Sequence, residues 1–164
     1  MPFTDQTLKL VPPQNLSSFF DEVVSAHDIV KRLAVGNPGD GALVDGKAWK
    51  VKNKLKLYRV YNKSNPYSKM GNWWLFKSPY NKMTQEEFRN KFVVCTEWSP
   101  LDAIVQANIQ PGAIVFLGKG QSGACKTKQR PESNEQQIYV LNPQKAFPKQ
   151  SADIIEKDMK WLTK

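Results

Sequence analysis

The sequence predicts an α+β domain, in which short antiparallel strands are flanked by one N-terminal and one C-terminal helix. Four short runs rich in β-branched and aromatic residues follow one another, and the breaks between them contain Pro, Gly, Ser and Asn. This alternation is typical of strands joined by turns in a meander. Apolar residues recur at helical spacing near both ends of the chain, which predicts the two helices. The four runs cover residues 92–96, 103–109, 113–118 and 136–141.

The N-terminal helix is expected over residues 16–34. Its apolar positions repeat every three or four residues, and Asp21 and Glu22 stand in the first turn, where the helix dipole favours acidic groups. The glycine-rich segment 36–46 ends this helix. It lacks the Gly-Lys-Ser/Thr ending of a phosphate-binding loop and no strand precedes it, so we expect an ordinary loop. The C-terminal helix is expected over residues 151–162.

Residues 48–61 alternate well enough to form one or two strands. In an extended chain Leu55, Leu57 and Arg59 share one face. An Arg that points inward among apolar neighbours must find an anion or several acceptors, because an unpaired buried charge is costly. Two interpretations stay open: an inward Arg59 that binds an anion, and an Arg59 that reaches solvent at the end of its strand.

Segment 62–80 is expected to be a long loop rich in aromatic and small polar residues. The adjacent Trp73 and Trp74 would point to opposite sides of an extended chain, which predicts one ring in the core and one at a surface cleft. Aromatic rings flanked by Asn, Ser and Lys can stack on a nucleobase or a nicotinamide ring. Plain packing of these rings is the alternative interpretation.

One helix start is expected before the run 92–96, and a second one, before the run 103–109, stays open as an alternative. Thr84 and Glu87 have the spacing of a capping box, which predicts a short helix. Ser99 followed by Pro100 also has the pattern of a helix start. If that second helix forms, the run 103–109 is helical and the meander has three strands.

The length and composition of the chain limit the class of protein. A chain of 164 residues, of which 40% are hydrophobic, is expected to form a single domain. It contains no run of about eighteen apolar residues, so no membrane span is expected. The first thirty residues lack a charged start followed by an apolar block, so no secretory signal is expected. The expected parts are a helical N-terminal extension at 1–47, a β core at 48–150 and the C-terminal helix at 151–164.

The net charge of +9 favours partners that carry negative charge, such as nucleic acid, anionic membranes, phosphate-bearing ligands or an acidic protein. The densest basic segment, 50–56, alternates Lys with Val, Asn and Leu, as a solvated strand face also would. Cys95 and Cys125 lie thirty positions apart. A disulfide in an oxidising compartment and a pair of buried thiols both stay open.

Several catalytic classes lack the residues that they need. His27 is the only histidine, which excludes a ribonuclease that works through two histidines and leaves a zinc enzyme without its usual ligands. No Gly-x-Ser-x-Gly nucleophile elbow is present. Two thiols cannot form a zinc site alone, so no metal site is expected.

Three segments that remain stand in a recognisable order. An Arg lies on an early strand, a run ending in Thr lies in the middle, and a Glu-Gln-Gln sequence leads into a late strand. This order resembles the ADP-ribosyltransferases and NAD glycohydrolases of the toxin type, and so does the Pro-Gly link at 111–112. The resemblance covers residues 55–141 and implies two split antiparallel sheets. The segments are Tyr-Arg-Val-Tyr at 58–61, Phe-Val-Val-Cys-Thr at 92–96 and Glu-Gln-Gln-Ile-Tyr-Val at 135–140.

The resemblance implies that NAD or NADP is the substrate and that the nicotinamide–ribose bond is cleaved. Arg59 would hold the pyrophosphate, and a polar residue near the ribose would stabilise the positive charge that develops there. Gln137 stands where the transferases carry their catalytic Glu, as in relatives that only hydrolyse NAD. We therefore expect a glycohydrolase. The expected catalytic residues are Arg59, Gln137, Glu135 and Glu97, and Glu97 is a candidate to replace the missing catalytic acid. The expected NAD-binding residues are Arg59, Tyr58, Thr96, Trp73, Trp74, Trp98 and Gln121. Tyr67 is a further candidate for the aromatic residue beside the nicotinamide ring.

Two alternatives to a glycohydrolase stay open. One is a mono-ADP-ribosyltransferase acting on protein or nucleic acid, and the other is a non-catalytic basic module that binds nucleic acid or an acidic partner. The resemblance also implies a toxin or effector domain that is secreted or delivered into a target cell without a signal peptide. A cytoplasmic location is the alternative. A toxin of this kind would need a cognate immunity or inhibitor protein in the cell that produces it.

Overall fold

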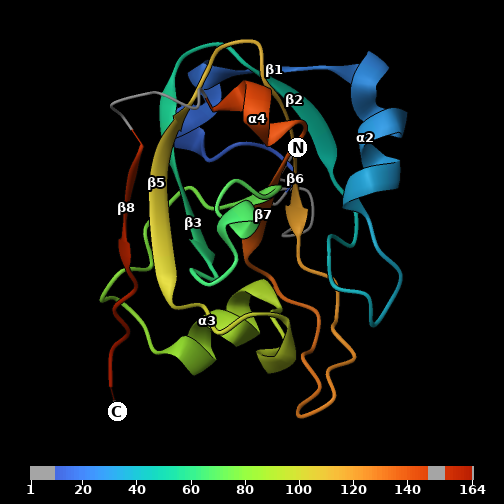
Figure 1. Ribbon diagram of the computed structural model, residues 1–164. Coiled ribbons are helices and arrows are strands. Elements are labelled where there is room, and N and C mark those ends of the chain that lie inside the picture. The colour runs from blue at the N-terminus through green and yellow to red at the C-terminus, as the bar shows by residue number, and fades with distance from the viewer. Residues whose placement is uncertain (1–9, 148–153, 164) are drawn as a thin grey trace.

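The computed structural model describes residues 10–147 and 154–163. The architecture is α+β, with two antiparallel sheets (Figure 1), so the predicted class is confirmed. The five-stranded sheet has the order β1-β2-β6-β7-β4 and the three-stranded sheet has the order β3-β5-β8. The strands are β1 (Phe20–Glu22), β2 (Lys47–Val51), β3 (Leu55–Tyr61), β4 (Trp73–Trp74), β5 (Ala103–Ile109), β6 (Ile114–Lys119), β7 (Gln136–Val140) and β8 (Ile155–Asp158).

Short helices connect and cover the strands. The α-helices are α2 (His27–Ala34), α3 (Gln85–Phe92) and α4 (Pro143–Ala146), and 3₁₀ helices occur at Gln14–Phe19, Val24–Ala26, Pro66–Ser68 and Thr96–Trp98. The predicted capping box starts α3, because the Thr84 hydroxyl accepts a hydrogen bond from the Glu87 backbone N–H at 3.1 Å. Within the described part of the chain, no helix has both the length and the apolar character needed to cross a membrane.

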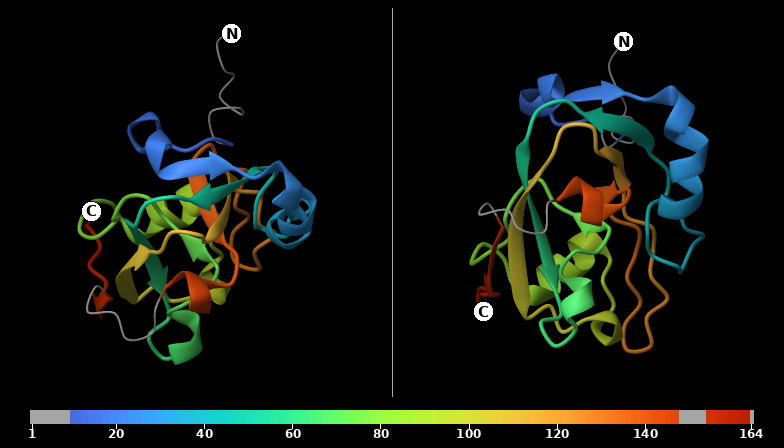
Figure 2. Two further views of the ribbon diagram at one scale, coloured as in Figure 1. Left: turned by 90° about the horizontal axis from the view of Figure 1, so that it is seen from above. Right: turned by 45° about the horizontal axis from the view of Figure 1, so that its top comes forward.

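Three apolar clusters hold these layers together. The largest lies between the two sheets, where alternate residues of β3 and β5 such as Leu57 and Val105 meet residues of β6 and β7. A second cluster packs α2 onto the outer face of the five-stranded sheet, with Val30 against Phe116 (Figure 2). In the third, Phe88 of α3 packs on the outward-facing residues of the three-stranded sheet. The described residues therefore place α2 and α3 on different sheets.

Backbone hydrogen bonds also join the two sheets at one point. Tyr58 of β3 donates to the Leu75 carbonyl at 3.0 Å, and Leu75 donates back to the Tyr58 carbonyl at 2.7 Å. Leu75 directly follows β4, which is an edge strand of the five-stranded sheet. The pairing brings the middle of β3 next to the residue that follows the two adjacent tryptophans of β4.

The predicted N-terminal helix is correct only in its second half. Residues 27–34 are helical, but Phe20–Glu22 form the edge strand β1, which pairs with β2. Phe20 is 6% exposed and belongs to the core between the sheets. Pairing with β2 and burial of Phe20 outweigh a local helical pattern that the chain can satisfy only weakly by itself.

The predicted C-terminal helix is wrong in the described residues. Residues 151–153 lie outside them, and Ile155–Asp158 form β8, which pairs with β5 along residues 103–106. The apolar residues of this segment serve another purpose than a helix face. Met159 and Trp161, which follow the strand, pack against the cluster that contains Phe88 of α3. A free edge of β5 offers hydrogen-bond partners that an isolated short helix lacks.

The expected four-strand meander is also wrong. Residues 92–96 form no strand, because α3 extends to Phe92 and Val93 ends it in a left-handed conformation with φ of 50°. Residues 103–109 do form a strand, β5, which rules out a helix starting at Pro100, but β5 belongs to the three-stranded sheet. Of the four expected strands, only the third and the fourth, which form β6 and β7, pair with each other as the meander requires.

Candidate functional site

A cavity of about 450 Å³ lies where β3, the end of β4, α3 and the segment after α3 meet. Its volume falls in the range of small-molecule sites, roughly 300–1,000 Å³. Arg59 of β3 and Gln137 of β7 both line this cavity, although they are far apart in the sequence and belong to different sheets. The structure thus brings together the two residues on which the predicted chemistry depends.

Arg59 enters the cavity from the inward face of β3 and is held by neutral groups. Its Nε donates to the Ser68 carbonyl at 2.8 Å and its Nη1 donates to the Trp73 carbonyl at 3.0 Å. Among the described residues no carboxylate pairs with it. Burial lowers the pKa of Arg59 to about 10, so the group stays charged at neutral pH. A fixed cation without a countercharge, at the wall of a cavity, is suited to bind an anion.

Gly71 leaves room for this guanidinium. A Cβ at position 71 would lie 2.4 Å from Arg59 Nη2 and 2.6 Å from its Cζ. The backbone of Gly71 therefore forms one side of the slot that holds Arg59. The Gly71 carbonyl also accepts a hydrogen bond from the indole N–H of the neighbouring Trp74, at 2.8 Å.

Gln137 is 7% exposed and is oriented by one hydrogen bond. Its Nε2 donates to the Phe92 carbonyl at 2.9 Å, at the C-terminal end of α3. Gly120 packs against the same carboxamide, since a Cβ there would lie 2.5 Å from Nε2. The other end of the carboxamide, Oε1, accepts no hydrogen bond from a described residue. This oxygen can therefore accept a hydrogen bond from a ligand hydroxyl.

The adjacent tryptophans point to opposite sides of β4, as predicted. Trp74 is 1% exposed and stacks on Phe147 in the core, with ring centroids 4.2 Å apart. Trp73 packs edge-on against Tyr139, on the face covered by α2. Both are among the residues that line the cavity, but their rings are committed to packing. Their contribution at this site is structural, through the Trp73 carbonyl that holds Arg59.

Trp98 provides the most accessible aromatic wall of the cavity. It is 48% exposed, and its ring lies over Gly41, where a Cβ would be 3.0 Å from Cη2. Tyr67 is 92% exposed and lies on the 3₁₀ helix beside two residues that line the cavity, Asn65 and Ser68. These two rings are therefore the exposed aromatic surfaces at and near the opening.

Five of the predicted site residues are not among the residues that line the cavity: Glu135, Glu97, Tyr58, Thr96 and Gln121. Glu135 and Thr96 are exposed, and Tyr58 is half-buried beside Leu75. The Glu97 carboxylate accepts a hydrogen bond from the Lys126 backbone N–H at 2.5 Å, which lowers the pKa of Glu97. Gln121 is buried, and its Nε2 donates to the Gly36 carbonyl at 3.2 Å, so it fastens one loop to another.

Asp40 is a cavity residue that sequence reasoning missed. It lies in the glycine-rich segment 36–46, which was expected to be an ordinary loop, and it lines the cavity together with Ala42. The signal that was present is its position between two glycines, Gly39 and Gly41, which both adopt positive φ. Only the folded loop shows that this acid lies on the same cavity as Arg59.

Cys95 and Cys125 form a disulfide, with their Cα atoms 5.3 Å apart, which settles the question that the sequence left open. The bond ties the segment after α3, which lines the cavity, to the long loop between β6 and β7. The donor atoms of Cys95, Glu97 and Cys125 lie within 4.8 Å of one another. Because the two sulfurs are bonded to each other, they do not offer a metal two thiolates.

An ion pair between the buried Arg130 and the half-exposed Glu86 fixes the same loop to α3. Arg130 is 2% exposed, and its Nη1 donates to Glu86 at 2.5 Å and to Asn90 at 2.8 Å. Hydrogen bonds from Arg130 and Lys128 lower the pKa of Glu86 to about 2. The loop that supports Gln137 is thus held at both the disulfide and this ion pair.

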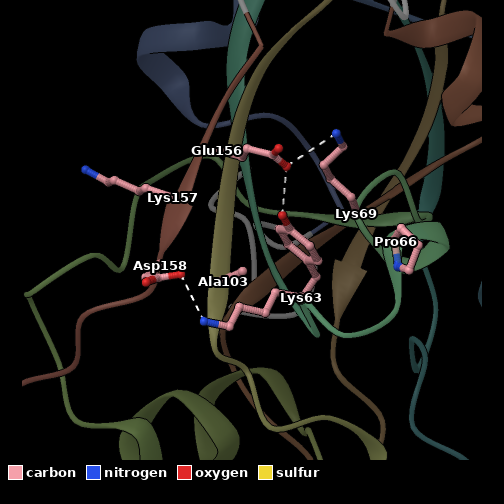
Figure 3. A pocket seen from close by; sticks show the side chains of 8 residues that line it. Lys63, Pro66, Lys69, Ala103, Glu156, Lys157 and Asp158 are labelled. Atoms are coloured by element: carbon pink, nitrogen blue, oxygen red, sulfur yellow. Dashed lines mark hydrogen bonds and ion pairs between the residues drawn. The ribbon is translucent and has the colours of Figure 1, made fainter.

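A second cavity, of about 330 Å³, lies against β8 and shares Tyr61 with the first (Figure 3). Four of its five charged side chains form ion pairs, Lys63 with Asp158 at 3.2 Å and Lys69 with Glu156 at 3.3 Å, and the fifth, Lys157, lies over the Tyr80 ring. The Tyr61 hydroxyl donates to Glu156 at 2.9 Å, and burial together with this carboxylate raises the pKa of Tyr61 to about 12. This internal pairing makes it a weaker candidate for an anionic ligand than the Arg59 cavity.

Comparisons with known proteins leave the family open. No protein-family model matches the chain, and no curated protein matches it. Among solved structures, a structure of Tne2 in complex with Tni2 is similar to 77% of this chain and 100% of that chain, with 9% identity and a TM-score of 0.49. A likeness at that level is too weak to assign a family or an activity.

Proposed function

We propose that the protein is an NAD glycohydrolase, which cleaves the nicotinamide–ribose bond of NAD or NADP. The observation that carries the proposal is the meeting of Arg59 and Gln137 on one cavity of about 450 Å³. One residue supplies a fixed positive charge without a described carboxylate partner, and the other supplies an unused carbonyl oxygen. These are the complementary groups for a pyrophosphate and for a ribose hydroxyl.

The residues can share the reaction as follows. Arg59 binds the pyrophosphate through its remaining N–H groups, since Nε and one N–H of Nη1 are used by backbone carbonyls. Gln137 Oε1 accepts a hydrogen bond from a hydroxyl of the nicotinamide ribose. Trp98 lies beside the nicotinamide ring. When the C1′–N bond breaks, its electron pair leaves with nicotinamide, and Gln137 stabilises the positive ribosyl group electrostatically. Water then adds to C1′ and releases a proton.

Nicotinamide release from NAD and NADP tests the proposal. Purified protein should release nicotinamide without an acceptor, and Arg59→Ala and Gln137→Ala should each lower kcat/KM by about tenfold or more, the scale of one lost transition-state contact. Arg32→Ala and Gln144→Ala change exposed residues outside the cavity and are the matched controls. Thermal unfolding of each variant separates a loss of contact from a loss of fold. A folded wild-type protein that releases no nicotinamide would overturn the proposal.

Hydrolysis rather than transfer is supported by the absence of Glu135 from the cavity lining. A transferase of the resembled type would need a carboxylate two residues before or at the position of Gln137. ADP-ribose found by mass spectrometry on a protein or nucleic acid, in place of free ADP-ribose, would favour the transferase.

A toxin or effector role follows from this chemistry rather than from a separate observation. An enzyme that consumes NAD harms any cell interior that it enters. We therefore extend the proposal to a toxin domain that acts inside a target cell. A cognate inhibitor protein in the producing cell belongs to the same proposal, and the opening of the Arg59 cavity is the surface that such a protein would cover.

A further inference from the structure

Among the described residues that line the Arg59 cavity, Asp40 is the acidic residue and Arg59 the basic one. The two belong to different segments of the chain. Arg59 is held by the carbonyls of Ser68 and Trp73, whereas the exposed Asp40 lies in the glycine-rich loop, next to Gly41, which the Trp98 ring approaches. The two side chains make no ion pair with each other. The cavity lining therefore carries one positive and one negative side chain that are not paired with each other.

Backbone hydrogen bonds fix the position of Asp40 on both sides. The Gly39 N–H donates to the Ser122 carbonyl and to its hydroxyl, each at 3.1 Å. The Gly41 N–H donates to the same Ser122 carbonyl at 3.0 Å, and Ala124 donates to the Gly39 carbonyl at 2.9 Å. The loop is thus fastened to the segment that also carries the disulfide. The Asp40 carboxylate itself accepts no hydrogen bond from a described residue, so it is available to a ligand.

Close approaches lead from the residue after Asp40 to Gln137. The Trp98 ring lies close to Gly41, since a Cβ there would be 3.0 Å from Cη2, and a Cβ at Gly123 would approach both Trp98 and Val93. A Cβ at Gly120 would in turn approach Val93 and Gln137. The exposed aromatic ring and the carboxamide thus lie in one series of neighbouring groups that begins beside Asp40, and all three residues line the cavity.

The charge pattern matches a dinucleotide with an oxidised nicotinamide ring. Such a molecule carries negative charge on its pyrophosphate and positive charge on the ring, and the positive charge passes to the ribosyl group when the C1′–N bond breaks. Opposite charges in a partly enclosed site attract more strongly than in water. A substrate with its pyrophosphate at Arg59 has its cationic end in the same cavity as Asp40.

We infer that Asp40 is the acidic catalytic residue of the proposed glycohydrolase, in the role for which Glu135 and Glu97 were expected. Its carboxylate faces the cationic ribosyl group in the transition state. It then accepts the proton from the water whose oxygen forms the new bond to C1′, so that nicotinamide, ADP-ribose and one proton leave the site. This inference rests on the proposed function, and it adds that the oxidised, cationic ring is the preferred substrate form.

Asp40→Asn tests this role, because it removes the charge and keeps the shape. In nicotinamide release, its kcat should fall by about tenfold or more while KM changes much less, as for a contact made mainly in the transition state. Asp45→Asn is the matched control: Asp45 is an exposed acid of the same loop, outside the cavity lining, paired with Lys31 at 3.6 Å. It should keep wild-type turnover.

A binding measurement provides the second readout. Wild-type protein should bind NAD⁺ more tightly than NADH, whose nicotinamide ring is neutral, and Asp40→Asn should reduce this preference by at least threefold. A variant that merely misfolds would lose affinity for both dinucleotides alike. If the wild type releases nicotinamide and Asp40→Asn does so equally well with the same preference, the role of Asp40 is overturned and the glycohydrolase stands. If the wild type releases none, both proposals fail.

Discussion

Replacing Gly71 by Ala tests whether the exact placement of Arg59 matters, without removing the arginine. The new Cβ would lie 2.4 Å from Arg59 Nη2, and ordinary contact begins near 3.4 Å, so the guanidinium must move by about 1 Å. The obstructing atoms belong to the far end of a flexible side chain, so the fold can adjust. Two charge-assisted hydrogen bonds, to the carbonyls of Ser68 and Trp73, are weakened or lost.

The expected cost differs for stability and for activity. The displaced guanidinium regains hydrogen bonds from water, so we expect a loss of only about 1–2 kcal/mol in the free energy of unfolding. A misplacement of about 1 Å can lower a rate a hundredfold, so kcat/KM for NAD should fall by about ten- to a hundredfold. Most of this loss should appear as a higher KM, because Arg59 binds the pyrophosphate equally before and during the reaction.

Gly112→Ala is the matched control for Gly71→Ala. Gly112 lies in the turn between β5 and β6 with φ of 94°, and a Cβ added there would have no atom within 4 Å. Alanine at this position should cost about 1–2 kcal/mol of stability through backbone strain and leave nicotinamide release unchanged. Urea denaturation and steady-state kinetics of both variants check the pair. Wild-type KM and kcat in Gly71→Ala would refute the argument that this slot positions Arg59 for a ligand.

Two further predictions concern stability. Removing the Cys95–Cys125 disulfide by a double substitution to Ser should lower the free energy of unfolding by about 3–4 kcal/mol, the chain-entropy value for a loop of about thirty residues; an unchanged urea midpoint would contradict this. Glu86→Gln should lower stability by about 1 kcal/mol at neutral pH, after allowance for the solvent screening of a half-exposed carboxylate. Because the folded-state pKa of Glu86 is lowered from 4.5 to about 2, its contribution is complete above about pH 4.5 and is lost as the pH falls toward 2. Melting temperatures of wild type and variant should therefore converge at low pH, and a constant difference would show that Arg130 does not act on this carboxylate.

The sequence identified the parts that local patterns specify. Alternation over 55–61 predicted β3 and put Arg59 on the same face as Leu55 and Leu57, and of the two open interpretations the structure favours the inward Arg59, which lines the cavity. The spacing of Thr84 and Glu87 predicted the start of α3. Local rules suffice in these cases, because a strand face and a helix cap depend on residues only a few positions apart.

Sequence reasoning failed where distant partners decided the outcome. Residues 20–22 and 155–158 became edge strands because β2 and β5 offered them free backbone groups, against a helical pattern. The expected acids came from the resembled motifs: Glu135 stands two residues before Gln137 and Glu97 follows Thr96, and neither lines the cavity. Asp40 is distant in sequence, and no periodicity marks it.

By itself, the sequence determined the α+β class, the strand face that Arg59 shares with Leu55 and Leu57, the opposed tryptophans and the polar residue at 137. Only the tertiary structure decided that Arg59 points inward and shares a cavity with Gln137, that Cys95 and Cys125 are joined, and that Asp40 lines the same cavity. The physical reason is that side-chain direction follows from a few neighbouring dihedral angles. The meeting of two walls instead depends on how whole sheets pack and where loops are fastened.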